Sequence, residues 1–223
     1  MHVVALALVL SLIGAAVSFH PSLQGSPWMW LAFGLGQVPV AALALRKLHA
    51  DEELRDRLLP RWGDISLGMG SALLLLAGTW VARKSIAPDG SLRHDWLTRA
   101  YEQAGDPDLL EKYWAPVLAA VLVFTALEEI GWRGLVMPTL EERLGTRLAW
   151  PATGLLYGLA FVPTAWWLRT DAGPNPLVIG AALLGGCVWS FLAARTQRLI
   201  PSILSHAVFV WFVVVQFRLM SLP

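Results

Sequence analysis

Long apolar segments recur along the whole chain and are separated by shorter polar connections. A helix needs about 20 apolar residues to cross the hydrocarbon core of a membrane, and most of these segments approach that length. Of the 223 residues, 56% are hydrophobic and 15% are charged, whereas about 25% of the residues of a soluble domain are charged. We therefore predict an all-α fold, a polytopic transmembrane helical bundle of about seven helices. The expected spans are residues 3–19, 28–45, 65–81, 115–127, 150–167, 177–194 and 200–217.

The polar connections leave no room for a sizeable soluble domain, so a single membrane domain over residues 1–223 is expected, with the lipid bilayer as its surroundings. No basic run indicates a nucleic-acid partner. Residues 3–19 lack the positively charged start of a cleaved signal peptide, which favours an uncleaved first helix. Cys187 is the single cysteine, so it has no partner for an intrachain disulfide, and we expect it to serve helix packing.

Positive charges in the connections predict the orientation of the chain, because cytoplasmic loops carry an excess of lysine and arginine. The connections on the side of the N-terminus hold ten such residues, and those on the other side hold seven. This excess predicts a cytoplasmic N-terminus, and a bacterial plasma membrane is the expected location. The ten are Arg46, Lys47, Arg55, Arg57, Arg61, Arg133, Arg143, Arg147, Arg195 and Arg198; the seven are Arg83, Lys84, Arg93, Arg99, Lys112, Arg169 and Arg218.

Two adjacent glutamates and an arginine follow the fourth apolar segment. Ionisable groups at membrane depth are rare unless they are paired or functional. In a helix, Glu129 and Arg133 lie four residues apart and can form a salt bridge, whereas Glu128 points roughly 100° away. We predict that Glu129 and Arg133 pair and that Glu128 faces the bundle interior, available for chemistry. The alternative is that both glutamates lie in interfacial water and have no role.

The sequence around these charges resembles the motifs of the CPBP family, the CAAX-protease and bacteriocin-processing membrane proteins. Glu-Glu-x-x-x-Arg-Gly at 128–134, followed by an apolar run and Pro138, is similar to the first motif of that family. An aromatic residue, Tyr157, begins a segment like the second motif, and His206 lies where the last motif has a histidine. The resemblance covers residues 117–213, which are the expected CPBP-like catalytic core.

The resemblance implies a glutamate-type intramembrane endopeptidase that cleaves a membrane-anchored protein or peptide near the bilayer surface. Glu128 would activate water, Glu129 and Arg133 would support it, and His206 would donate to the oxyanion or act as a second base. We expect His206 across a polar cavity from Glu128, within roughly 20 Å, on the cytoplasmic side. No cofactor is expected, and no metal either, because one histidine and two carboxylates lack the usual spaced ligands.

Two positions depart from the family pattern: Phe161 replaces the second-motif histidine, and Val210 replaces the polar residue four positions after His206. We expect Phe161 to fill the space of the missing imidazole. Loss of one donor or proton shuttle typically lowers a rate by about 10²–10⁴-fold, so weak or absent activity is expected. A non-catalytic relative, a bacteriocin-immunity factor or a scaffold, is the alternative, in which His206 only bonds a neighbouring helix. A transporter is disfavoured because no internal repeat is evident.

Overall fold

The computed structural model describes residues 1–216, which form helices joined by turns, with no strand in that range. The predicted all-α fold is confirmed. Phe217, at the end of the seventh predicted span, and Arg218, in the charge count, lie outside the described residues. The α-helices are α1 (His2–Ser18), α2 (Pro27–Ala50), α3 (Leu54–Leu58), α4 (Asp64–Ile86), α5 (His94–Ala104), α6 (Pro107–Lys112), α7 (Trp114–Gly131), α8 (Met137–Leu144), α9 (Thr146–Ala160), α10 (Val162–Trp167), α11 (Leu177–Thr196) and α12 (Ile200–Trp211). A 3-10 helix, η1 (Pro21–Leu23), and two π-helices, η2 (Trp132–Val136) and η3 (Phe212–Gln216), complete the described chain.

The apolar segments of the sequence form the long helices of the structure, which is that of an integral membrane protein. Within residues 1–216, five helical stretches are long and apolar enough to cross a membrane, and two shorter apolar helices account for the other two predicted spans. A helix suits this setting because it satisfies its backbone hydrogen bonds internally. The five are Pro27–Ala50, Asp64–Ile86, Trp114–Leu144, Thr146–Trp167 and Leu177–Thr196; the shorter ones are His2–Ser18 and Ile200–Gln216.

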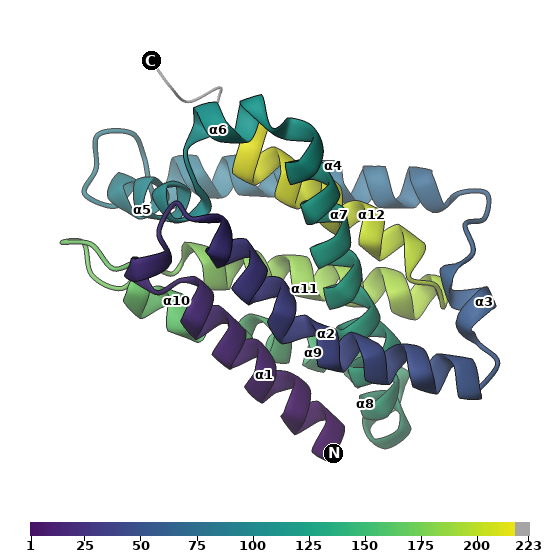
Figure 1. Ribbon diagram of the computed structural model, residues 1–223. Coiled ribbons are helices and arrows are strands. Elements are labelled where there is room, and N and C mark those ends of the chain that lie inside the picture. Colours follow the sequence, from purple (N-terminus) through teal and green to yellow (C-terminus); the bar gives the residue numbers. More distant parts are fainter. Residues whose placement is uncertain (217–223) are drawn as a thin grey trace.

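Helix α7 crosses the middle of the bundle and carries the two glutamates at its carboxyl end (Figure 1). It packs on both α2 and α12, and η2, which follows it, contacts α9 and α11. Around this centre α1 packs along α2, α12 along α4, and α9 along α11. Side chains from α7, α9, α11 and α12 can therefore meet at the end of α7.

The contact between α9 and α11 is close because a glycine faces the single cysteine. A Cβ atom added at Gly154 would lie 2.6 Å from Sγ of Cys187 and 2.8 Å from its Cα atom. Cys187 thus lies in a helix–helix contact, as predicted. Gly68 has a similar place between α4 and α12, where an added Cβ would lie 2.9 Å from Cβ of Leu204. Small residues allow helices to approach closely in lipid, where packing rather than the hydrophobic effect drives their association.

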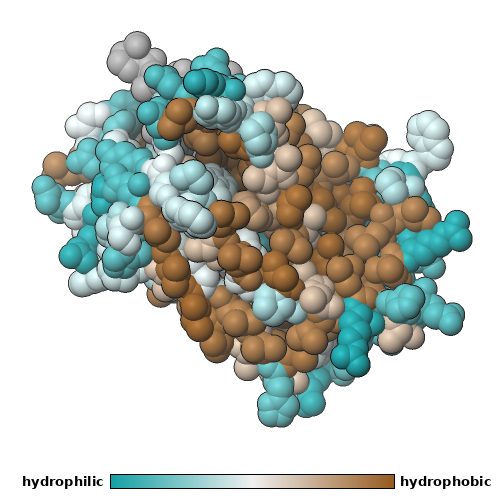
Figure 2. All heavy atoms as spheres, in the orientation of Figure 1, coloured by the Kyte–Doolittle hydropathy of each residue, from teal (hydrophilic) through white to brown (hydrophobic). Residues whose placement is uncertain are grey.

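A broad apolar surface covers the middle of the face drawn in Figure 2, between hydrophilic regions at its left and right. Large apolar side chains are exposed on α1, α2, α4 and α7, among them Ile13, Leu35, Leu74 and Val123. In water such a surface would be unfavourable, whereas lipid chains can cover it. The bundle therefore crosses the bilayer from one hydrophilic end to the other, with the apolar surface in contact with lipid.

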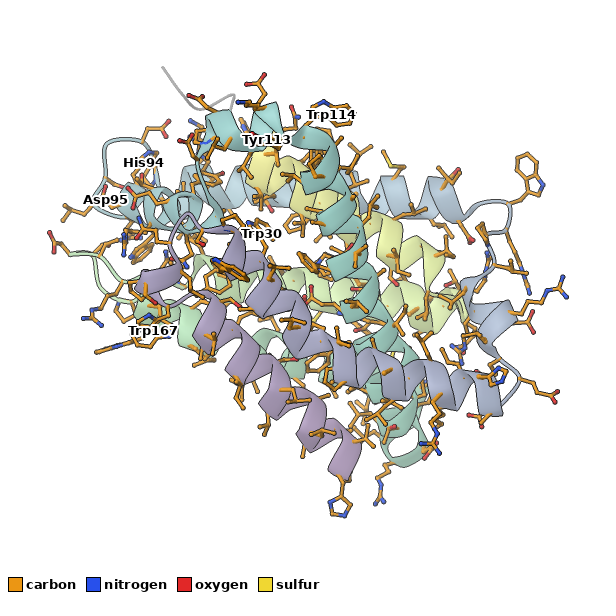
Figure 3. All side chains as sticks on the ribbon, viewed as in Figure 1. Trp30, His94, Asp95, Tyr113, Trp114 and Trp167 are labelled. Carbon is orange, nitrogen blue, oxygen red and sulfur yellow. The ribbon has the colours of Figure 1, made fainter. Side chains whose placement is uncertain are left out.

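Aromatic side chains lie near one of these hydrophilic ends, around α5 and at the start of α7 (Figure 3). The indole Nε1 of Trp30 donates to the carbonyl oxygen of Ala104 at 2.9 Å and so joins α2 to the end of α5. Tyr113 and Trp114 are more than half exposed where α6 meets α7. Tryptophan and tyrosine are enriched at the membrane–water interface, so this end of the bundle lies at one membrane surface.

Arg133 does not lie in a connection, which corrects the count of loop charges. The helical segment continues from α7 through η2 into α8, and Arg133 is completely buried within it. The ten positive residues on the side of the N-terminus therefore become nine, against seven. The connection that contains α3 and the connection that contains α5 and α6 lie at opposite ends of the bundle (Figure 1), in agreement with the predicted alternation of sides.

Candidate functional site

The segment with the two glutamates changes from an α-helix to a π-helix just after them. All residues of η2, Trp132–Val136, are buried. Pro138 follows closely and has no amide hydrogen, so it cannot donate to the carbonyl oxygen of Gly134 four residues earlier. Single π-helical turns within α-helices are frequent at functional sites. The two glutamates and the arginine thus lie on one continuous helical segment that is widened locally.

The predicted salt bridge between Glu129 and Arg133 is present. Oε1 of Glu129 lies 3.1 Å from Nη1 of Arg133, and neither side chain has any exposed surface. Helix α11 binds the other nitrogens of the guanidinium: Nη2 donates to the carbonyl oxygen of Gly186 at 2.9 Å, and Nε donates to Oγ of Ser190 at 3.2 Å. A buried ion pair is tolerated when its remaining donors are also hydrogen-bonded, and α11 supplies these acceptors.

His206 reaches this pair from α12 and lies between the two glutamates. Its Nδ1 is 2.8 Å from Oε1 of Glu129, and its Nε2 is 3.8 Å from Oε2 of Glu128. Because an ionised Glu129 can only accept, we assign the Nδ1 proton to the bond with Glu129. In the neutral imidazole this leaves the lone pair of Nε2 directed toward Glu128.

Glu128 is buried, with 3% of its surface exposed, and is not part of the Glu129–Arg133 pair. Its Oε1 accepts a hydrogen bond from the hydroxyl of Tyr157, on α9, at 2.9 Å. Its Oε2 is the oxygen that faces His206. Glu128 therefore has one oxygen fixed by α9 and the other directed at the imidazole.

Trp189 holds the imidazole of His206 from one face. The two rings are stacked, with centroids 3.6 Å apart and planes 18° apart. Nε1 of Trp189 donates to Oγ of Ser205 at 3.1 Å, and that hydroxyl hydrogen-bonds with Oγ of Ser71, on α4, at 2.9 Å. These contacts connect α4, α11 and α12, so the plane of the imidazole is set by three helices.

The two substituted motif positions are apolar in their surroundings as well as in their side chains. Phe161 is buried, and its ring centroid lies 5.3 Å from that of Tyr157 and 5.7 Å from that of Phe33. Val210 packs against the apolar core. Neither side chain has a polar atom to offer to Glu128 or to a substrate.

The structure brings all four predicted site residues together: Glu128, Glu129, Arg133 and His206. Tyr157 was predicted only as the aromatic position of the second motif, with no polar role. The hydrogen bonds that join Trp189, Ser205 and Ser71 were not predicted either, nor was the bond from Arg133 to Ser190. No local pattern indicated the bond of Tyr157 to Glu128, because the two residues are 29 apart in the chain and lie on different helices.

The predicted cavity between His206 and Glu128 is replaced by a direct approach of the two side chains, 3.8 Å apart. A surface pocket of about 290 Å³ lies elsewhere, between α2, α3 and α8, and its lining is Lys47, Leu48, Asp51, Glu53, Arg57, Gly134, Pro138, Glu141 and Glu142. Among residues 1–216, no group of three or more His, Cys, Asp and Glu side chains is placed to hold a metal ion.

Comparison with known proteins gives one match. Residues 110–212, just under half of the chain, match the family model described as type II CAAX prenyl endopeptidase Rce1-like. This range includes the two glutamates, Arg133, Tyr157 and His206. No curated protein and no solved structure matches the chain.

Proposed function

Because the family match supports membership of this chain in the CPBP family, we propose that it is an intramembrane endopeptidase that cleaves a membrane-anchored protein or peptide. One observation carries the proposal: Oε2 of Glu128 and Nε2 of His206 face each other at 3.8 Å inside the bundle. Glu129 and Arg133 neutralise each other beside them. In this proposal Glu128 is the base, and Glu129 with Arg133 forms the structural ion pair, as expected from the sequence.

The proposed reaction is hydrolysis of a peptide bond by an activated water molecule. Glu128 takes a proton from water, and the water oxygen forms a bond to the scissile carbonyl carbon. The carbon–nitrogen bond then breaks, and Glu128 returns the proton to the departing nitrogen. The products are a new carboxyl end and a new amine. A base held in a water-poor site close to the scissile bond accelerates such a reaction through position as well as proton transfer.

Of the two roles considered for His206, second base fits its hydrogen bonds better than oxyanion donor. Nδ1 donates to Glu129, so Nε2 of the neutral ring is an acceptor. An acceptor at 3.8 Å from Oε2 of Glu128 can bind the second hydrogen of the attacking water. His206 would then orient the water while Glu128 removes its proton.

The substrate proposed here is a membrane-anchored chain, prenylated or not, cleaved near the cytoplasmic surface of a bacterial plasma membrane. Two features support this placement. The carboxyl end of α7 lies toward the end of the bundle that carries the N-terminus (Figure 1), and the connections at that end hold the larger number of lysines and arginines.

A non-catalytic role, as a bacteriocin-immunity protein or a scaffold, is the second candidate. The apolar packing of Phe161 and Val210 favours it, because those positions lack the donor groups of the family motifs. In that case the buried Glu129–Arg133–His206 contacts would serve stability alone, and Glu128 would be dispensable.

The two functions are separated by proteolysis in liposomes with a panel of membrane-anchored fluorogenic peptides. We expect cleavage by the wild type that falls at least about 10²-fold in Glu128→Gln. The matched control is Glu142→Gln, an exposed glutamate on α8, which should cleave like the wild type. Cleavage that survives Glu128→Gln would exclude Glu128 as the base. Absence of cleavage throughout, including in variants with restored motif residues, would favour the scaffold.

A further inference from the structure

Helix α9 contributes a polar group to Glu128 from a position that the motif comparison treats only as aromatic. We propose that the hydroxyl of Tyr157 positions Glu128 for the reaction and supplies the polar contact from α9 that Phe161 cannot make. The inference rests on the proposed function, since it concerns how the base is held. Tyr157 acts through Glu128 and is therefore a positioning residue.

The hydrogen bond is specific to one carboxylate oxygen. The hydroxyl of Tyr157 donates to Oε1 of Glu128 at 2.9 Å, while Oε2 faces Nε2 of His206 at 3.8 Å. If Oε1 were free, the carboxylate could rotate about its terminal torsion, which has a broad and shallow energy profile. Fixing Oε1 therefore fixes the direction of Oε2, the oxygen that takes the proton in the proposed reaction.

The ring of Tyr157 is itself held on several sides, so its hydroxyl has a defined position. Tyr157 is 2% exposed and makes edge-to-face contacts with Trp132, Phe161 and Trp189, at centroid distances of 5.3, 5.3 and 6.1 Å. The guanidinium of Arg133 lies over the ring at 4.7 Å from its centroid. These contacts involve the ring alone, so a phenylalanine at this position would keep them and lose only the hydroxyl.

Position along α9 explains how a tyrosine can take over from a histidine four residues later. Phe161 directly follows the last residue of α9 and is four residues after Tyr157, and the rings of the two residues are in contact. The tyrosine is one turn away from the family position, and its longer side chain reaches Glu128. Tyr157 keeps its proton throughout the reaction and forms no covalent bond.

A purely structural tyrosine would also need a partner for its buried hydroxyl, so the test must separate positioning from stability. The measurement is cleavage of a fluorogenic membrane-anchored peptide in liposomes, with kcat and KM determined separately. Tyr157→Phe is compared in two backgrounds, the wild type and Phe161→His, which restores a polar side chain to α9. Tyr113→Phe, at an exposed position at the start of α7, is the matched control.

In the wild-type background we expect Tyr157→Phe to lower kcat about 10²-fold with KM unchanged, because the base is misdirected while substrate binding is retained. In the Phe161→His background the same substitution should lower kcat by about tenfold or less, because the imidazole can hold Glu128 instead. Tyr113→Phe should behave like the wild type. Thermal unfolding in detergent should give similar midpoints for Tyr157→Phe and the wild type.

An equal loss of kcat from Tyr157→Phe in both backgrounds, or no loss in either, would overturn the inference while leaving the proposed function intact. A wild type without Glu128-dependent cleavage beside an active Phe161→His variant would overturn both for this chain, because Tyr157 would then not compensate for the missing histidine. Absence of Glu128-dependent cleavage in every background, including Phe161→His with Val210→Asn, would overturn the proposed function and the inference with it.

Discussion

One carboxylate oxygen, Oε1 of Glu129, connects the structural part of the site to the part assigned to chemistry. It lies 3.1 Å from Nη1 of Arg133 and 2.8 Å from Nδ1 of His206. Both contacts are strongest when Glu129 is ionised, and Arg133 is the cation that balances this charge within the bundle. The orientation of His206 toward Glu128 therefore depends on Arg133, which is linked to the imidazole through Glu129 and through the ring of Trp189.

Arg133→Ala should lower the free energy of unfolding more than Glu128→Ala does. Arg133→Ala leaves Glu129 as a buried charge without its cation, and breaking a buried pair in this way costs about 3–5 kcal/mol. Glu128→Ala removes one hydrogen bond, that of Tyr157, and should cost about 1–3 kcal/mol. Unfolding of both variants in detergent, monitored by circular dichroism, measures the difference. Equal stability and equal expression would contradict the division between a structural and a chemical glutamate.

Restoring the two family residues should raise activity. Phe161→His adds a polar group beside Tyr157, and Val210→Asn adds a possible donor on α12, four residues after His206 on the same helix face. We expect the double variant to cleave a membrane-anchored reporter at least about 10²-fold faster than the wild type, because each restored donor is worth a factor of that order or more.

The control for that experiment is the same double variant with Glu128→Gln, assayed at matched expression. Activity that rises in the double variant and disappears with Glu128→Gln would support the base assignment. A double variant no faster than the wild type would contradict the view that these two positions limit the rate.

At the scale of elements, the site depends on how closely α9 and α11 approach. Tyr157 lies on α9, and Trp189, Ser190 and the carbonyl group of Gly186 lie on α11. These groups contact Glu128, His206 and Arg133 only because the two helices are in backbone contact near Gly154. A wider separation would move the tyrosine hydroxyl and the acceptors of Arg133 apart.

Gly154→Ala should therefore destabilise the protein. The added methyl group would lie 2.6 Å from Sγ and 2.8 Å from Cα of Cys187, and such overpacking typically costs about 1–3 kcal/mol. Gly180→Ala, on α11, is the matched control, because nothing lies within 4 Å of its added Cβ atom. The free energy of unfolding of that control should be unchanged or higher by up to about 1 kcal/mol. Equal unfolding midpoints for the two variants would contradict the close α9–α11 contact.

At the scale of the whole molecule, the bundle has two hydrophilic ends with an apolar surface between them (Figures 1 and 2). The connection that contains α3 belongs to one end, and the connection that contains α5 and α6 belongs to the other. The excess of positive charge proposed to face the cytoplasm is at the α3 end.

Cysteine labelling tests this arrangement. In a Cys187→Ala background, we expect Arg93→Cys, beside α5, to react with a membrane-impermeant maleimide in intact spheroplasts. Arg55→Cys, on α3, should react only after the membrane is opened. Both positions are exposed, so access to reagent is not limited by the fold. Labelling of both from one side would contradict the transmembrane arrangement, and the reverse pattern would contradict only the orientation.

The sequence was sufficient for the helical fold and for the four residues of the proposed site. Helical spans depend on the length and composition of single segments, and the Glu129–Arg133 pair depends on a four-residue spacing within one segment, so both are local properties. The family motifs added His206, and the match over residues 110–212 confirmed the resemblance. The site roles of these residues stay predictions until the assays above are done.

The groups that each of those residues contacts follow from how the helices pack against one another. Local sequence did not indicate that Arg133 is buried within a continuous helix, that His206 bonds Glu129 more closely than Glu128, or that Tyr157 reaches Glu128. The physical reason is that α7, α9, α11 and α12 are separate helices of the chain, and their relative positions follow from how small residues such as Gly154 allow helix backbones to approach. Distances between side chains on different helices are set by that packing, which no single segment encodes.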